Sequence, residues 1–229
     1  MGAITANGGS LSISLPPVLF TSAAAAKIDG STKTFQIVDP VLRRLDPSTA
    51  PLVEIDTSGA GSNWASADPS TFRIDYLFGL VTFNDPPLAA ALVRLSGYYL
   101  PIATVALVRS LSLSISNDVV ELQVFGDGYK RRAVTLRDFA GELSGLTGPG
   151  ADLDPGVGVT SIAAAAASGA AFLAEFASGG PQVFRAWVKV PELSHKLTPG
   201  ALYEHTVKFV GYSFPVGRDA AVAWGYGSP

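Results

Sequence analysis

Between residues 110 and 116 every second residue is a serine, and the residues between the serines are aliphatic. A period of two fits a β-strand, whose side chains alternate between two faces, whereas a helix would scatter the serines around its circumference. The aliphatic set comprises Leu107, Leu111, Leu113 and Ile115, with Arg109 as an interruption. The stretch therefore predicts a strand with one aliphatic face and one hydroxyl face.

The alternation inverts after Asn117 and Asp118. Beyond this pair, Val120, Leu122 and Val124 form the apolar set, with Glu121 and Gln123 between them. A change of parity across a turn-forming pair is what a hairpin with one buried face requires. We therefore expect a hairpin that turns at Asn117 and Asp118.

The rest of the chain indicates a mainly β fold. Further alternating stretches predict strands at 72–76, 80–83, 92–100, 130–136, 183–190 and 203–212. Gly79 supplies a positive φ for a turn between the first two. An Ala-rich stretch predicts one flanking α-helix at about 160–178, ended by Gly179, Gly180 and Pro181. We expect a single domain over residues 1–229, with a long loop or extended hairpin at 46–70.

Composition excludes several classes of protein. Only 15% of the residues are charged, 48% are hydrophobic, and there is no cysteine. A charged fraction far below the usual figure of about 25% suggests a surface that neighbouring subunits cover. No disulfide framework or cysteine-based metal site is possible. The apolar stretch 162–174 is shorter than the roughly 20 residues that span a bilayer, so we expect no membrane association.

The sequence contains no familiar catalytic or cofactor motif, and we expect neither an enzyme nor a cofactor. The one metal set that can be drawn comprises His195, His205, Glu192 and Glu204. We favour ordinary surface histidines, because strand spacing does not bring the two together unaided. Asp152 and Asp154 have oxygen ligands that suit a divalent cation, but they lack the rest of a calcium loop, and we favour a solvated turn.

Two other groups of residues suggest binding. The densest positive patch comprises Lys130, Arg131, Arg132 and Arg137. These side chains suit either nucleic-acid phosphates or acidic groups on a neighbouring subunit, and the net charge of −3 favours subunit or solvent contact. Trp187 and Trp224 belong to an aromatic-rich C-terminal region that suits a core or interface, with carbohydrate stacking as the alternative.

Three stretches in this order resemble the tail tube protein of long-tailed phages. The first is 72–83 followed by 92–99, in which Gly79 and Val81-Thr82-Phe83 precede a strand ending in Tyr98 and Tyr99. The second is 111–129 followed by 136–145, which ends in Leu143-Ser144-Gly145. The third comprises the Ala-rich helix, the strand 183–190 and the stretch 199–211. Residues 46–70 have no place on this pattern, and 213–229 look like a C-terminal extension.

The resemblance implies a β-sandwich or partial barrel with a flanking helix, whose strands contribute to an inner β-barrel shared by six copies. Stacked rings would then form a tube through which double-stranded DNA passes without specific binding. The implied partners are further copies of the chain and the tape measure, tail tip and tail terminator proteins. The implied location is the virion, after synthesis in the cytoplasm of the bacterial host.

On this reading the hydroxyl face of the hairpin lines the lumen, since small hydroxyls and acidic groups do not retain DNA as aromatic or basic groups would. The lumen candidates are Ser112, Ser114, Ser116, Glu121 and Gln123. Lys130, Arg131, Arg132 and Arg137 are the candidates for contacts between rings or subunits. The alternatives are another virion β-sandwich, such as a tail terminator or fibre domain, and a secreted carbohydrate-binding module.

Overall fold

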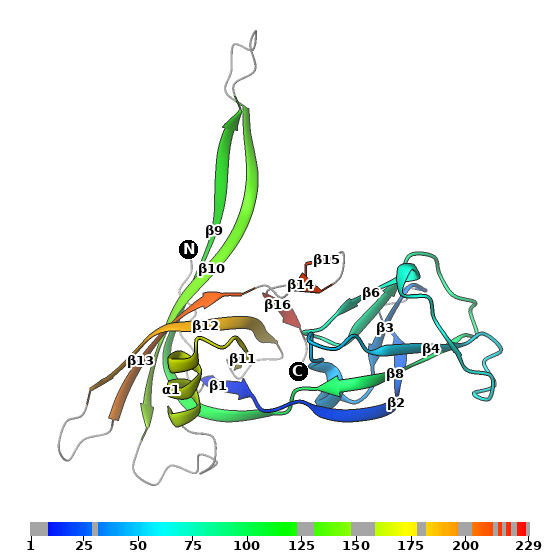
Figure 1. The fold of residues 1–229 in the computed structure, drawn as a ribbon, viewed down its shortest axis with the longest axis horizontal. Helices are drawn as coiled ribbons and strands as arrows, with labels where there is room; N and C mark the ends of the chain where they lie inside the picture. The colour runs from blue at the N-terminus through cyan, green and yellow to red at the C-terminus, as the bar shows by residue number, and fades with distance from the viewer. Residues whose placement is uncertain are drawn as a thin grey trace.

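The computed structural model describes residues 9–28, 32–122, 131–147, 159–177, 182–196, 203–212, 215–216, 219–220 and 224–227. As predicted, the fold is mainly β, and it is built on two seven-stranded antiparallel sheets (Figure 1). The first sheet comprises β1 (Gly9–Ser14), β9 (Ile102–Leu122), β10 (Arg131–Thr147), β11 (Phe172–Ala177), β12 (Val183–Lys196), β13 (Tyr203–Gly211) and β16 (Trp224–Gly227). The second comprises β2 (Val18–Lys27), β3 (Thr34–Ile37), β4 (Leu52–Asp56), β5 (Ala65–Ser66), β6 (Phe72–Asp75), β7 (Leu80–Phe83) and β8 (Leu92–Tyr99).

The remaining elements are short. They are the 3-10 helices η1 (Pro40–Arg43) and η2 (Pro69–Thr71), the α-helix α1 (Val159–Ser168), and the paired strands β14 (Pro215–Val216) and β15 (Asp219–Ala220).

The first sheet curls into a partial barrel. Its strand order is β11-β1-β9-β10-β13-β12-β16, and β11 also pairs with β12, which joins the sheet back on itself. The enclosed core is rich in aromatic residues, including Phe139, Phe176, Phe184 and Phe209. The helix α1 packs against β12 and buries Ile162 in the same core.

The second sheet has the order β5-β4-β8-β2-β3-β7-β6 and its own core around Phe35, Ile37 and Leu95. The predicted turn between β6 and β7 is present, and Gly79 adopts a φ of 61°. In the segment 46–70, strands β4 and β5 pair as an antiparallel hairpin.

The chain crosses between the sheets on two adjacent paths. β1 continues into β2 through Pro16 and Pro17, and β8 continues into β9 through Pro101. Proline cannot donate to a ladder, so these residues end one sheet and start the next. The amide of Leu15 donates to the carbonyl of Pro101 at 2.7 Å and ties the two crossings together.

The predicted turn at Asn117 and Asp118 is wrong. β9 runs without a break from Ile102 to Leu122, and Asn117 pairs with Arg137 of β10. The chain reverses between Leu122 and Arg131, outside the described residues. The inverted alternation thus marks a change in which face of one long strand is apolar, and not a turn.

The predicted helix at about 160–178 is too long. α1 ends at Ser168, where Gly169 adopts a φ of 64°, the left-handed conformation that commonly ends helices. The residues that follow form β11, whose phenylalanines and leucine favour a strand and pair with β12. The stop signal was Gly169, ten residues before the predicted Gly179.

Candidate assembly surface and buried junction

The outer part of β9 and β10 projects away from both sheets as a two-stranded ribbon (Figure 1). At its base, β1 pairs with β9 only as far as Val108, and β13 pairs with β10 only from Ala140 onward. Beyond these points the two strands pair only with each other among the described residues. Among the described residues, both edges of the ribbon are therefore open.

The base of the ribbon is shaped by two glycines. Gly141 pairs with Phe209 across β10 and β13, and a Cβ on Gly141 would lie 2.3 Å from Cζ of that ring. A Cβ on Gly211 would lie 2.5 Å from the ring of Phe139. The glycines thus leave room for two buried rings that lie against bare backbone at the point where the ribbon leaves the barrel. Beside them, the hydroxyls of Ser110 and Ser144 are 2.6 Å apart.

The register separates the predicted lumen residues. Ser112, Ser114 and Ser116 are exposed, in keeping with one hydroxyl face. In the continuous strand Glu121 takes the opposite parity from the serines, so the expected grouping of all four on one face is wrong. Gln123 lies outside the described residues. A register shift at Arg109 likewise places Leu107 at the opposite parity from Leu111.

The predicted contact residues fall on the strand opposite. Arg132 pairs directly with Glu121, an arrangement of opposite charges across two strands. Arg137 pairs with Asn117, and Arg131 pairs with Leu122. Lys130 lies outside the described residues. The structure therefore brings a predicted lumen residue and a predicted contact residue together on the outer ribbon.

The structure places the two histidines on neighbouring strands. His195 and His205 are register partners across β12 and β13, so the pairing of these strands brings together two positions that spacing alone did not. Glu192 and Glu204 occupy register positions of the opposite parity, and Glu192 accepts a hydrogen bond from Nζ of Lys208 at 2.8 Å. Among the described residues, no group of three or more histidine, aspartate or glutamate side chains is placed to hold a metal.

Three further expectations concern a cation loop, carbohydrate stacking and a membrane span. Asp152 and Asp154 lie outside the described residues. Trp187 is 2% exposed and offers no surface for carbohydrate stacking. None of the described helices is long and apolar enough to cross a membrane.

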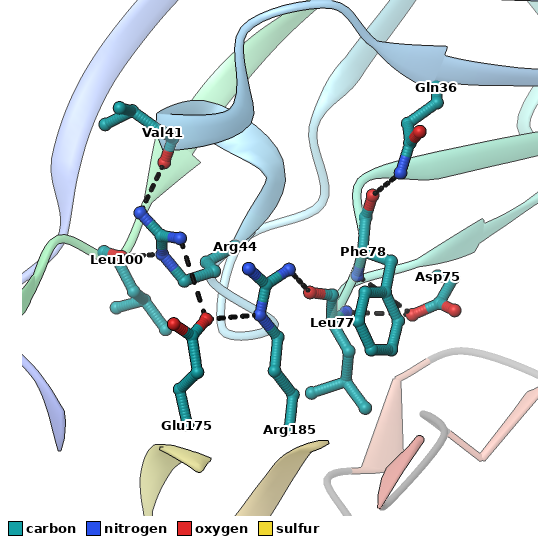
Figure 2. Close-up of polar contacts among 9 residues, drawn as sticks. All are labelled: Gln36, Val41, Arg44, Asp75, Leu77, Phe78, Leu100, Glu175 and Arg185. Carbon is teal, nitrogen blue, oxygen red and sulfur yellow. Dashed lines mark hydrogen bonds and ion pairs between the residues drawn. The ribbon is translucent and has the colours of Figure 1, made fainter. Parts of the chain in front are cut away.

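A buried charged cluster, which the sequence reading missed, lies where the two sheets meet (Figure 2). Glu175 of β11 accepts a hydrogen bond from Nε of Arg185 of β12 at 2.6 Å. Nη1 of Arg44, which follows η1 beside the second sheet, lies 3.8 Å from the same carboxylate oxygen. All three residues are buried, and Arg185 is 0% exposed. The sequence signal for this cluster was Glu175 as the single charged residue in the apolar stretch 172–177, and Arg185 as the single charged residue in 183–188.

The two arginines also bind backbone carbonyls of the second sheet and its flanks. Arg185 donates from Nη1 to the carbonyl of Leu77 at 2.9 Å. Arg44 donates to the carbonyls of Leu100 and Val41 at 3.3 and 3.1 Å. Burial lowers the pKa of Arg44, and Glu175 acts in the opposite direction. The cluster therefore links β11 and β12 of the first sheet to the backbone of Leu77, Leu100 and Val41 on the side of the second sheet.

An apolar core surrounds the cluster and draws on both sheets. It contains Leu77 and Phe78 from the turn between β6 and β7, together with Leu173, Val183 and Trp187 of the first sheet and Leu100 between them. The ring of Phe78 lies 5.0 Å from the guanidinium of Arg185 and packs against the glycine backbone of β16 at Gly225 and Gly227. Burial raises the pKa of Asp75, whose carboxylate accepts the amides of Leu77 and Phe78.

The fold and these sites define a mainly β chain with two joined sheets and a ribbon whose edges are open among the described residues. No family model matches the chain, and no curated protein matches it. Its fold is similar to that of a chain in the virion of a native gene transfer agent particle. That match has 11% identity, covers 56% of this chain and 89% of the other, and has a TM-score of 0.40.

A chain in the tail of an empty gene transfer agent particle with C6 symmetry is similar at 10% identity, with 77% of this chain and 95% of the other covered and a TM-score of 0.40. Similarities at this level do not assign a function.

Proposed function

We propose that this chain is a structural protein of a phage-type tail, and that it is the tube subunit, with residues 1–229 acting as one domain. Six copies would form a ring, and stacked rings would form the conduit for DNA. The observation that carries this proposal is the ribbon formed by β9 and β10, whose two edges are open, among the described residues, over more than ten residues of β9.

An open edge presents unpaired amide and carbonyl groups and is normally covered or blunted. A two-stranded ribbon is also only marginally stable in water when it stands alone. Both problems disappear if the β9 edge of one copy pairs with the β10 edge of the next, since closure of a ring leaves no free edge. The exposed serines at 112, 114 and 116 would then form one polar surface of the shared barrel.

The apolar pattern of the outer ribbon supports the same proposal. On one parity of β9 lie Leu111, Leu113 and Ile115, and Leu113 packs against the first core. On the other parity, that of the serines, lie Val120 and Leu122. A strand whose apolar positions change parity along its length suits cover on both of its faces. Neighbouring copies supply that cover in the proposed ring, in agreement with a charged fraction of only 15%.

The test is electron microscopy of the purified chain beside a variant with a shortened ribbon. Replacing residues 118–136 by Asn-Gly closes the ribbon at the pair formed by Asn117 and Arg137, with a two-residue turn. We expect the parent to form rings that stack into tubes, alone or on a tail-tip initiator. We expect the variant to keep its melting temperature and to remain monomeric.

Other results would contradict the proposal. A parent chain that stays monomeric at high concentration, with no rings or tubes, would exclude a tube subunit. Rings that never stack would favour a tail terminator. Tubes formed by the shortened variant would exclude the removed outer part of the ribbon, residues 118–136, as the assembly surface.

A further inference from the structure

The junction between the sheets contains two kinds of contact with different geometric demands. The apolar core around Leu77 and Phe78 holds the sheets together but is non-directional, because hydrophobic burial depends on area. The cluster of Arg44, Glu175 and Arg185 consists of charge-assisted contacts, which require particular distances and angles. Only the second kind selects one relative orientation of the sheets.

The cluster is poorly suited to stabilise the fold. Two guanidinium groups and a carboxylate lose their water on burial, and such clusters often contribute no more than apolar side chains of equal volume. Nη2 of Arg185 is fully buried and has no acceptor among the described residues, which adds a further cost. A role in orientation explains why charged groups occupy a position that apolar groups would fill at less cost.

We propose that Arg44, Glu175 and Arg185 form a positioning cluster, which fixes the direction of the ribbon relative to the second sheet. Glu175 and Arg185 lie on strands of the curled sheet that carries the ribbon, and Arg44 and the carbonyl of Leu77 lie on the other side of the junction (Figure 2). A change of angle at the junction moves the distant end of the ribbon furthest. The significance of this role for tube geometry rests on the proposed function, but the orientation itself does not.

The experiment measures the distance between spin labels on the isolated full chain. Because the chain has no cysteine, Ser114→Cys on the ribbon and Thr82→Cys on the second sheet give two unique and exposed labelling sites. The apolar variant Arg44→Met/Glu175→Leu/Arg185→Met is compared with the labelled parent. We expect a melting temperature within about 5 °C of the parent, because the apolar replacements pack without buried charge.

For the same apolar variant we expect a label-distance distribution at least about twice as broad as that of the parent, or shifted to a new maximum, since the apolar contacts alone allow several angles. A distribution identical to that of the parent would overturn the proposal. A much lower melting temperature with an unchanged distribution would instead show that the cluster acts through stability. If the triple variant does not fold, Arg44→Met decides, because it keeps the pair formed by Glu175 and Arg185. An unbroadened distribution in Arg44→Met refutes the role, and recovery of the parent distribution by Arg44→Lys supports it.

The matched control is an arginine–glutamate ion pair that joins two strands within the second sheet. Arg94 of β8 binds Glu54 of β4 through contacts of 2.8 and 3.0 Å, both within the second sheet and away from the junction. Glu54→Leu/Arg94→Met should leave the label distance unchanged, and equal broadening there would overturn the proposal. Absence of tubes in the parent would contradict the proposed function while the label distances still decide the positioning role.

Discussion

Gly141 is the position at which the addition of one methyl group most directly tests the packing at the base of the ribbon. In Gly141→Ala the new Cβ would lie 2.3 Å from Cζ and 2.6 Å from Cε2 of Phe209, and 2.6 Å from the carbonyl oxygen of Ser112. The ring cannot withdraw easily, because it is 3% exposed and its centroid lies 5.2 Å from that of Phe176. The carbonyl is backbone and belongs to the ladder between β9 and β10.

Two opposing effects set the size of the loss. Overpacking of a dense core costs about 1–3 kcal/mol, and occasionally more. Alanine in place of glycine within a strand recovers roughly 0.5–1 kcal/mol of backbone entropy. Steric overlap with a fixed carbonyl outweighs the entropy gain, so we expect Gly141→Ala to lower the free energy of unfolding by about 1–2 kcal/mol.

Urea unfolding followed by circular dichroism measures this loss. Ala140→Ser, at the neighbouring exposed position, is the control and should change the free energy of unfolding by less than about 0.5 kcal/mol. In a Phe209→Leu background Gly141→Ala should cost less than in the parent, since the ring is part of the obstacle. A Gly141→Ala chain as stable as the parent would refute the argument that this base is packed to its limit.

Three further changes test other parts of the fold. The hydroxyl of Ser58 and the amides of Ser58 and Asn63 lower the pKa of Asp56 to about 2, so its stabilising effect is complete above the ordinary carboxyl pKa and is lost as the pH falls through about 2. Asp56→Asn should therefore be less stable than the parent at neutral pH and equal to it near pH 2, as thermal melts across this range would show; a constant difference would contradict the pKa. Leu77→Ala should cost about 2–5 kcal/mol in urea unfolding, because its fully buried side chain leaves a cavity at the junction; a loss below 1 kcal/mol would mean that the junction collapses around it. Arg94→Lys should increase the solvent exposure of Trp64, since the guanidinium carbon lies 4.2 Å from its ring centroid, and a red shift of tryptophan emission would report it; an unchanged spectrum would contradict the stacking.

The local strand signals were reliable because they depend on neighbours in the sequence. The strand at 80–83, the turn at Gly79 and the strand at 92–99 all follow from alternation and a residue that tolerates positive φ. The long helix failed because alanine is compatible with a helix or a buried strand, and pairing with β12 decides between them for residues 172–177. A helix prediction that had given Gly169 its usual weight as a stop signal would have ended near the observed residue.

The charged junction could not be predicted from spacing. Glu175 and Arg185 are ten residues apart and meet because β11 and β12 pair in one particular register. Arg44 is more than a hundred residues from either, and its approach depends on how the second sheet docks on the first. Only the presence of buried-looking charges in apolar strands was visible in the sequence, and that signal names no partner.

The inverted alternation at Asn117 and Asp118 carries more information than the turn it first suggested. A turn would have kept one apolar face against one core, and the pattern would then say nothing about other molecules. In a continuous strand the same pattern moves the apolar positions from the parity of Leu113, which packs against the first core, to the parity of the exposed Ser114. The change suits a strand whose outer part is covered by a second surface on the other side, as in the proposed ring of identical subunits.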